Sequence, residues 1–277
     1  MSDERTRHDR LLDRIARGER IEARDEMSGT YRDSLVHLMT MQADSELAGA
    51  YGYVPWIMKA PGVEEKLVVA QIVKDETRHA KVMYDLLEEL GQDVAGHVGT
   101  HDQSFARRLD DSEADIGTAR VASDKRVNIF YYPINTWFDF IVFNFCMDRG
   151  AGHQLEDSLH CSYKPWADVM EGIFKEEAMH MAHGDWWVKK LAADPETKDE
   201  AQEALNTWFP RTMNIFGRPN SPKNQVYRKL GIKKRDNEEV RQAFAAEIRS
   251  KCDQFGLKTP EWKPIAKNMT EEPFIPG

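Results

Sequence analysis

The stretch VVAQIVKDETRHAKVMYDLLEEL, residues 68–90, decides the fold class. Its apolar side chains recur in steps of one, three and four residues, which is the period of an α-helix with one buried face. Glu76 and His79 stand in the middle of that apolar face, three positions apart. Because a buried carboxylate without a partner is strongly unfavourable, the pattern predicts that both residues meet compensating groups inside a helical core.

A second stretch repeats this arrangement in residues 165–193, where Glu177 and His180 interrupt an apolar helical face. Each of the two stretches follows a helix-type segment that carries one acid among apolar residues, Glu46 in the first case and Asp148 in the second. The distance from this acid to the Glu-x-x-His pair is nearly the same in both. The four segments of helical period are residues 31–58, 62–90, 134–160 and 165–193.

Two such helical hairpins packed together would bring four carboxylates and two imidazoles into one core. The six side chains are Glu46, Glu76, His79, Asp148, Glu177 and His180. Ferritin-like proteins that bind two metal ions use this donor set, and carboxylates with two imidazoles favour iron or manganese over copper or thiolate-held zinc. We therefore predict an all-α, ferritin-like four-helix bundle with a two-metal centre, in which the four carboxylates are the candidate catalytic residues.

The acids beside each pair leave alternatives open. Glu176 stands four residues before His180, so it could replace Glu177 as a ligand, although the parallel with Glu76 favours Glu177. Asp75 and Glu176 are either outer acceptors that orient a metal-bound imidazole or exposed helix residues. Four further histidines are interpreted as ordinary polar residues: His37, His153, His160 and His183.

The chain is interpreted as a single ferritin-like domain over residues 1–277. Residues 1–28 are expected to form a charged N-terminal arm, and residues 31–193 the four-helix core. Residues 91–133 lack apolar periodicity and are expected to be a long connecting loop. Residues 194–277 are expected to form additional C-terminal helices and a tail.

Composition argues against several classes of function. With 38 Lys and Arg against 47 Asp and Glu, the net charge of −9 argues against a nucleic-acid binder. No apolar run is long enough to span a membrane, and the charged beginning of the chain does not indicate a secretory leader. The three cysteines form no CxxC pair, so no disulfide framework is expected. These features together favour a cytoplasmic protein.

Longer motifs extend beyond the metal pattern. In chain order they are ADSELAG (43–49), KDETRH (74–79), MDRGA (147–151), CSYKPW (161–166) and KEEAMH (175–180). This series resembles the catalytic subunits of the ring-1,2-phenylacetyl-CoA epoxidases, which are ferritin-like oxygenases of phenylacetate degradation. The resemblance runs from about residue 14 to residue 262.

The resemblance implies a di-iron monooxygenase, with manganese as the other possible metal. Such an enzyme uses O2, with electrons from NADPH that arrive through a reductase, to form an epoxide on the aromatic ring of a CoA thioester. The residues implied to contact the CoA moiety are Lys125, Lys233 and Asn237. The implied partners are an iron–sulfur flavin reductase and a ferritin-like structural subunit, in an oligomeric assembly.

The chain also departs from the family pattern. Ile72 stands where a lysine near the metal site is expected, and His37 where an arginine is expected. The 91–125 connection is longer than in the family pattern. Two alternatives therefore stay open: oxygenation of a different acyl-CoA such as benzoyl-CoA, or a non-catalytic ferritin-like scaffold or metal-binding protein.

Overall fold

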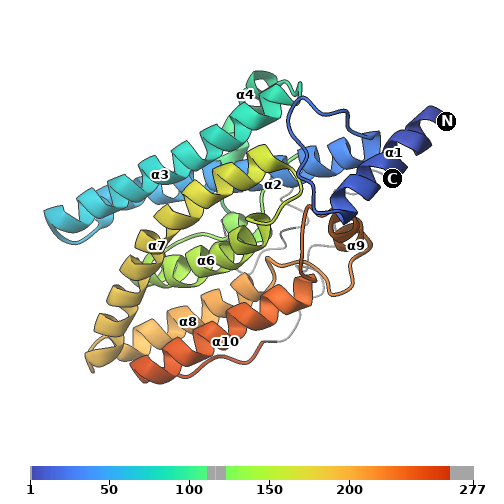
Figure 1. Ribbon diagram of the computed structural model, residues 1–277. Coiled ribbons are helices and arrows are strands. Elements are labelled where there is room, and N and C mark those ends of the chain that lie inside the picture. Colours follow the sequence, from blue (N-terminus) through green and yellow to red (C-terminus); the bar gives the residue numbers. More distant parts are fainter. Residues whose placement is uncertain (1, 111–115, 117–122, 263–277) are drawn as a thin grey trace.

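The computed structural model of the protein describes residues 2–110, 116 and 123–262 (Figure 1). Regular structure in these ranges is helical, apart from one isolated bridge between Ile21 and Tyr163, which confirms the predicted all-α class. In chain order the elements are α1 (Ser2–Ala16), α2 (Gly29–Lys59), α3 (Gly62–Glu89), α4 (Val94–Phe105), the short 3-10 helix η1 (Asn128–Tyr131), α6 (Trp137–Ser158), α7 (Lys164–Ala193), α8 (Lys198–Met213), α9 (Pro222–Lys229) and α10 (Asn237–Phe255).

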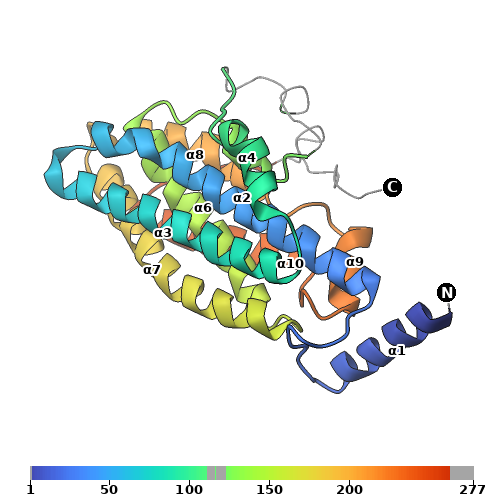
Figure 2. The same cartoon turned by 90° about the horizontal axis from the view of Figure 1, so that it is seen from above.

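Four long helices form the centre of the bundle. α2 and α3 make one hairpin, α6 and α7 make the other, and α3 packs against α7 (Figures 1 and 2). α8 packs on α6 and α7, and α10 packs on the same two helices. This pairing of two hairpins is the ferritin-like architecture that the repeated sequence pattern predicts.

Two of these helices begin at residues whose side chains bind free backbone N–H groups. Ser28 accepts a hydrogen bond from the N–H of Tyr31 at the start of α2. At the start of α6, the Thr136 hydroxyl accepts from the N–H of Asp139, and the Asp139 carboxylate accepts from the N–H of Thr136. Each such cap contributes about 1 kcal/mol. Each cap fixes the residue at which its helix starts. The caps therefore also fix the positions of Glu46 and Asp148 along the bundle.

An aromatic layer fills the space between α2 and α6. The rings of Trp137 and Phe140 stack at 5.0 Å, and Tyr53 meets Phe140 and Phe143 edge-on at 5.5 and 5.8 Å. Burial raises the pKa of Tyr53 above its ordinary value, and the nearby charge of Asp148 raises it further. The aromatic layer therefore borders the acids in the bundle.

The structure differs from the expected loop over residues 91–133. α4 occupies Val94–Phe105, and Asp93 caps its N-terminus. On the side that faces α2, the helix carries a histidine: His97 Nε2 donates to Asp44 over 2.8 Å. Because this contact is polar, the sequence lacks the apolar periodicity that would have indicated a helix.

The outer parts of the chain surround the bundle. The charged N-terminal arm contains α1, whose Arg7 pairs with Glu4 and Glu26. The predicted C-terminal helices are present as α8, α9 and α10, and the expected tail lies outside the described residues from residue 263 onward. Among the helices that the structure describes, none is both long and apolar enough to cross a membrane.

Candidate metal centre

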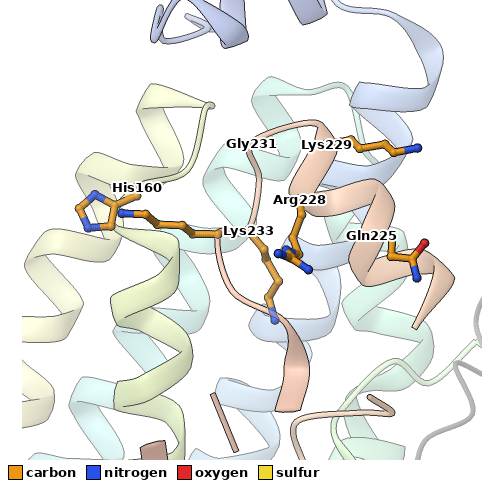
Figure 3. Close-up of a pocket in the computed structure, with 7 residues that line it drawn as sticks. His160, Gln225, Arg228, Lys229, Gly231 and Lys233 are labelled. Carbon is orange, nitrogen blue, oxygen red and sulfur yellow. The ribbon is translucent and has the colours of Figure 1, made fainter. Parts of the chain in front are cut away.

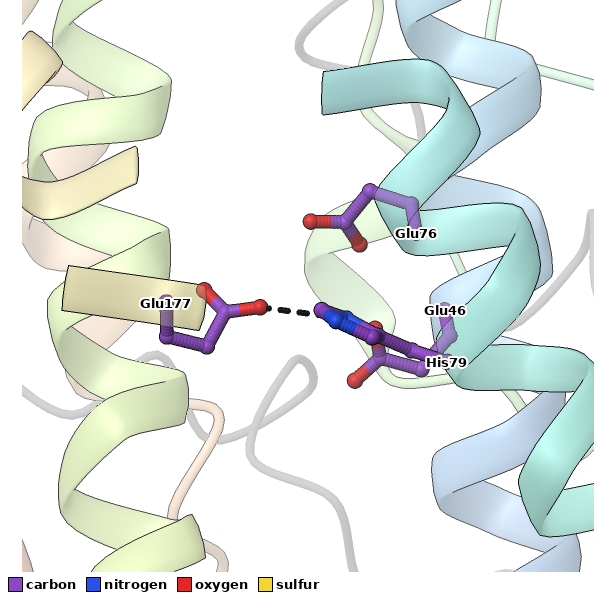
Figure 4. Close-up of side chains that lie close together, drawn as sticks. All are labelled: Glu46, Glu76, His79 and Glu177. Carbon is purple, nitrogen blue, oxygen red and sulfur yellow. Dashed lines mark ion pairs between the residues drawn. The ribbon is translucent and has the colours of Figure 1, made fainter. Parts of the chain in front are cut away.

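The six ligand-type side chains predicted from the sequence lie on the four long helices. They are Glu46 on α2, Glu76 and His79 on α3, Asp148 on α6, and Glu177 and His180 on α7. One ligand atom from each of four residues lies within 4.8 Å of the others, and these residues are Glu46, Glu76, His79 and Glu177 (Figure 4). Of the two remaining side chains, His180 contacts Glu76 and Glu177 of this group, and Asp148 lies near Glu177.

Glu177 lies between the two histidines. Its Oε1 is 3.3 Å from Nδ1 of His79, and its Oε2 is 3.4 Å from Nδ1 of His180. A second carboxylate faces each of these nitrogens: Glu46 Oε2 lies 3.4 Å from His79, and Glu76 Oε1 lies 3.3 Å from His180. Each Nδ1 atom is therefore approached by two carboxylates, as expected where several ligands converge on one ion.

The outer nitrogens of the same rings face acids from the opposite hairpin. His79 Nε2 lies 2.9 Å from Glu176, and His180 Nε2 lies 3.6 Å from Asp75. When Nε2–H of His79 donates to Glu176, Nδ1 carries the lone pair that a metal ligand needs. Of the two adjacent acids on α7, the structure thus places Glu177 inside the group and Glu176 outside it.

Asp148 borders the group from α6. Its side chain is buried, and the Asn144 amide donates to its Oδ2 over 3.4 Å. Burial, followed by the negative charge of Glu177, raises the pKa of Asp148 to about 8. A buried carboxyl beside another acid gains from any cation that enters the site.

The electrostatics of the whole group favour bound cations. Burial, followed by the charge of Glu46, raises the pKa of Glu76 well above its ordinary value. Burial disfavours the charged imidazoles, but the carboxylates that face them, Glu177 first, outweigh it and raise the pKa of His79 to about 10 and that of His180 to about 12. Without metal ions, bound protons therefore offset the negative charge of the acids. Divalent ions that bind here would displace those protons.

Buried polar atoms without hydrogen-bond partners also lie in this group of side chains. Within the described residues, Nδ1 of His79, Nδ1 of His180 and Oε2 of Glu46 are buried without a hydrogen-bond partner. Such atoms are uncommon in folded proteins and need a physical reason. A set of four carboxylates and two imidazoles, with the imidazole Nδ1 atoms facing inward, fits a pair of transition-metal ions.

The three residues with an implied CoA contact line one cavity, which we call the Lys125 pocket. This cavity has a volume of about 80 Å³, and Lys125, Lys233 and Asn237 are among its lining residues. His37 also lines it, with Nδ1 at 3.0 Å from the Tyr227 hydroxyl. Two residues depart from the family pattern. His37 lies in this pocket, whereas Ile72 lies in the apolar core.

The sequence did not indicate a second, narrower cavity beside the metal-type group, which the side chains close so fully that no water molecule fits in it. Its lining includes Gly49, Tyr53, Arg108 and Phe130. A Cβ atom at Gly49 would lie 3.3 Å from the Phe130 ring and 3.4 Å from Glu76 Oε2. We call this cavity the Gly49 cavity. A pair of glycines three residues apart inside α2 is the signal that could have revealed it, because glycine inside a helix often marks a close approach.

The helix α2 lines both the Lys125 pocket and the Gly49 cavity. It lines the Lys125 pocket at His37 and Met41 and the Gly49 cavity at Gly49 and Gly52, and Glu46 lies between these positions. The segment 125–134 forms the opposite side of both. At about 1.5 Å per residue, the α2 face from the first position to the last spans roughly 22 Å. The two cavities therefore lie along α2 on either side of Glu46.

The chain is similar to known proteins along most of its length. The family model described as "Phenylacetic acid catabolic protein" matches residues 1–274. A curated relative from Escherichia coli (strain K12), one of the subunits of 1,2-phenylacetyl-CoA epoxidase, is 29% identical over 263 residues. The matched region covers 92% of this chain and 78% of that relative.

Proposed function

The chain belongs to the family of phenylacetic acid catabolic proteins, and from this premise we propose that it is the catalytic subunit of a di-iron monooxygenase. Its reaction is the 1,2-epoxidation of the aromatic ring of phenylacetyl-CoA. One oxygen atom of O2 enters the ring and the other leaves as water, with electrons from NADPH and protons from solvent. The observation that carries the proposal is the buried group of carboxylates and imidazoles at the centre of the bundle.

The residues proposed to hold the metal ions are the six side chains predicted from the sequence. They are Glu46, Glu76, His79, Asp148, Glu177 and His180. Two iron ions held there would supply the activation of O2, and manganese is the other metal that suits this donor set. The outer acid Glu176 keeps the His79 ring turned so that Nδ1 faces inward, and Asp75 lies 3.6 Å from Nε2 of His180.

The proposed substrate path follows α2. The cations Lys125 and Lys233 attract the phosphates of CoA at the Lys125 pocket, and the Asn237 amide adds a polar contact. The pantetheine arm then lies between α2 and the segment 125–134, and the aromatic ring enters the Gly49 cavity, which is closed in the free protein and opens to admit it. Phe130 and its aromatic neighbours exclude water from the reacting ring.

The proposed assembly contains further proteins. The Escherichia coli relative is named as one component of a multi-subunit epoxidase, and we extend that organisation to this chain. The partners are an iron–sulfur flavin reductase, which delivers the electrons, and a ferritin-like structural subunit. We favour the enzyme over the non-catalytic scaffold because all six candidate ligands lie on the four bundle helices and four of them converge.

Turnover with a panel of thioesters tests this function. The protein loaded with iron and supplied with reductase and NADPH should convert phenylacetyl-CoA to an epoxide detected by mass spectrometry, in preference to benzoyl-CoA. Glu76→Ala and His180→Ala should lose both iron and product, whereas Glu171→Ala, an exposed residue of α7, should keep both. Iron and product retained in the first two variants, or no product from the wild-type protein, would contradict the proposal.

A further inference from the structure

Three tryptophan rings lie in contact near the C-terminal end of α7. The rings of Trp137 and Trp187 meet edge-on with centroids 5.5 Å apart, and those of Trp187 and Trp186 meet edge-on at 5.1 Å. We call these three residues the tryptophan row. The row has no part in the proposed substrate path, whereas the basic pocket beside α9 shares Lys233 with the Lys125 pocket and belongs to the site already described (Figure 3).

The tryptophan row leads from the metal-type group to the surface. Trp187 follows His180 by seven residues on α7, so the two side chains share one face of the helix and lie about 10 Å apart along its axis. Beside Trp187, the Trp137 ring stacks on Phe140 at 5.0 Å. Trp187 is 7% exposed and Trp186 is 55% exposed. Indole rings therefore connect the part of α7 that carries the candidate ligand His180 with solvent.

The chemistry of the indole ring sets the direction in which electrons move through the row. Indole rings are electron-rich, and they give up one electron only to a strong oxidant. Electrons from a reductase would have to be added to an indole, which accepts them far less readily than a metal ion does. The row therefore suits the transfer of electrons from its rings to a strongly oxidising metal centre.

The indole N–H groups of the two inner rings have no acceptor. Within the described residues, Nε1 of Trp137 and Nε1 of Trp187 are buried without a hydrogen-bond partner. Because an indole nitrogen only donates, an oxidised ring there has no neighbouring base to take its proton. The step is then the transfer of an electron alone, and the ring returns to its original state when another electron refills it.

A lysine limits the loss of electrons from the row. Nζ of Lys190 lies 4.6 Å from the Trp187 ring centroid and 4.9 Å from that of Trp186. The ammonium charge is attracted by the neutral rings and disfavours a positively charged ring beside it. Transfer through the row is therefore slowed, which leaves time for a bound substrate to be oxidised first.

We propose that the tryptophan row discharges the metal centre when O2 has been activated there without a bound thioester. This inference rests on the proposed function. One electron passes from Trp187 to the metal centre, Trp186 refills Trp187, and a soluble thiolate refills Trp186 and becomes a thiyl radical. Two such transfers, with two protons from solvent, convert the oxygen atom that would have entered the substrate into water. The two thiyl radicals combine as a disulfide.

Mass spectrometry of oxidised residues tests the row. The iron-loaded protein is incubated with reductase, NADPH, O2 and catalase, without thioester and without thiol, so that an oxidised Trp186 ring is not refilled. The wild-type protein should accumulate oxidation products at Trp186. Trp187→Phe keeps an aromatic ring at that position but removes the electron donor, so it should lose most of this product. Trp166→Phe, which replaces a buried tryptophan of the same helix outside the row, should match the wild type.

Two further measurements do not depend on the folding of Trp187→Phe. Lys190→Gln changes an exposed residue, removes the cation from both rings and should raise the yield of oxidised Trp186. The metal-free wild-type protein should leave Trp186 unoxidised under the same conditions. Equal yields in the wild type and in folded Trp187→Phe, an unchanged or lower yield in Lys190→Gln, or oxidised Trp186 without iron would overturn the proposal.

Addition of phenylacetyl-CoA separates this inference from the proposed function. The wild-type protein should then form epoxide, and oxidation of Trp186 should fall because the substrate takes the oxygen atom. Epoxide formation together with Trp186 oxidation that does not depend on Trp187 would refute the row and leave the function standing. Oxidation of Trp186 that needs both iron and Trp187, without epoxide from any thioester, would uphold the row and refute the proposed function.

Discussion

The two nitrogens of His79 have different neighbours, and this difference can be tested at the scale of one residue. Nδ1 faces Glu177, whereas Nε2 donates to Glu176. Glu176→Gln keeps the size of the side chain and removes the charge that orients the ring, so metal affinity should fall by roughly 10-fold to 100-fold. A chelator competition titration measures the affinity, and Glu171→Gln on the same helix is the control. The same affinity in both variants would show that Glu176 does not position the ring.

Gly49 provides a second test at this scale. Gly49→Ala would place a methyl group against the Phe130 ring and Glu76, so kcat/KM for the aromatic thioester should fall by roughly tenfold or more with iron retained. Gly172→Ala is the matched control, because a Cβ atom there meets nothing within 4 Å. That control should keep its activity and gain about 0.5–1 kcal/mol of helix stability. Full activity in Gly49→Ala would show that the reacting ring does not use this cavity.

Residues differ in how far the sequence could predict them. Glu76 and Glu177 were predictable because a carboxylate on an apolar helical face is unfavourable unless it has a partner. Both do lie in the group of converging side chains. Gly49 and Arg108 were not predicted. Their importance comes from contacts between separate segments, such as the bond from the Arg108 guanidinium to the Ala48 carbonyl, and helical periodicity does not report such contacts.

At the scale of elements, a partly buried ion network joins α10 to α6. Glu247 of α10 accepts hydrogen bonds from His153 and Arg149 of α6 over 2.9 and 2.6 Å. These bonds, that of His153 first, outweigh burial and lower the pKa of Glu247 from 4.5 to about 2. The charged carboxylate therefore stabilises the fold above the ordinary pKa, and this stabilisation is lost as the pH falls from about 4.5 to about 2.

Glu247→Gln tests that linkage in the metal-free protein. The free energy of unfolding from urea titrations should be lower in the variant than in the wild type at neutral pH. The difference should narrow as the pH falls through the window from about 4.5 to about 2. Because the Glu247 side chain is 39% exposed, solvent screening keeps the effect modest. A difference that is constant across that window would contradict the pKa shift.

The long helices and α4 show what a sequence pattern reports about elements. α2, α3, α6 and α7 each bury an apolar face, so their periodicity was strong and their approximate bounds were predictable. α4 instead faces α2 with His97, which bonds Asp44. Its stability comes from a cap and from polar contacts made only in the folded chain, and the expectation of an irregular connection there was wrong for Val94–Phe105.

At the scale of the whole molecule, α2 is the axis along which the proposed substrate sites lie. The Lys125 pocket, Glu46 and the Gly49 cavity follow one another along it. The sequence alone did not indicate that Lys125, Lys233 and Asn237 would meet, because they are far apart in the chain. Their roles were suggested by family resemblance, and the fold places them at one cavity.

Anomalous diffraction at the iron absorption edge, from crystals grown with ferrous iron, tests the central claim most directly. Two anomalous peaks per chain are predicted inside the bundle, within bonding distance of the side chains Glu46, Glu76, His79, Asp148, Glu177 and His180. Iron only at the protein surface, or no peak among these side chains, would contradict the account.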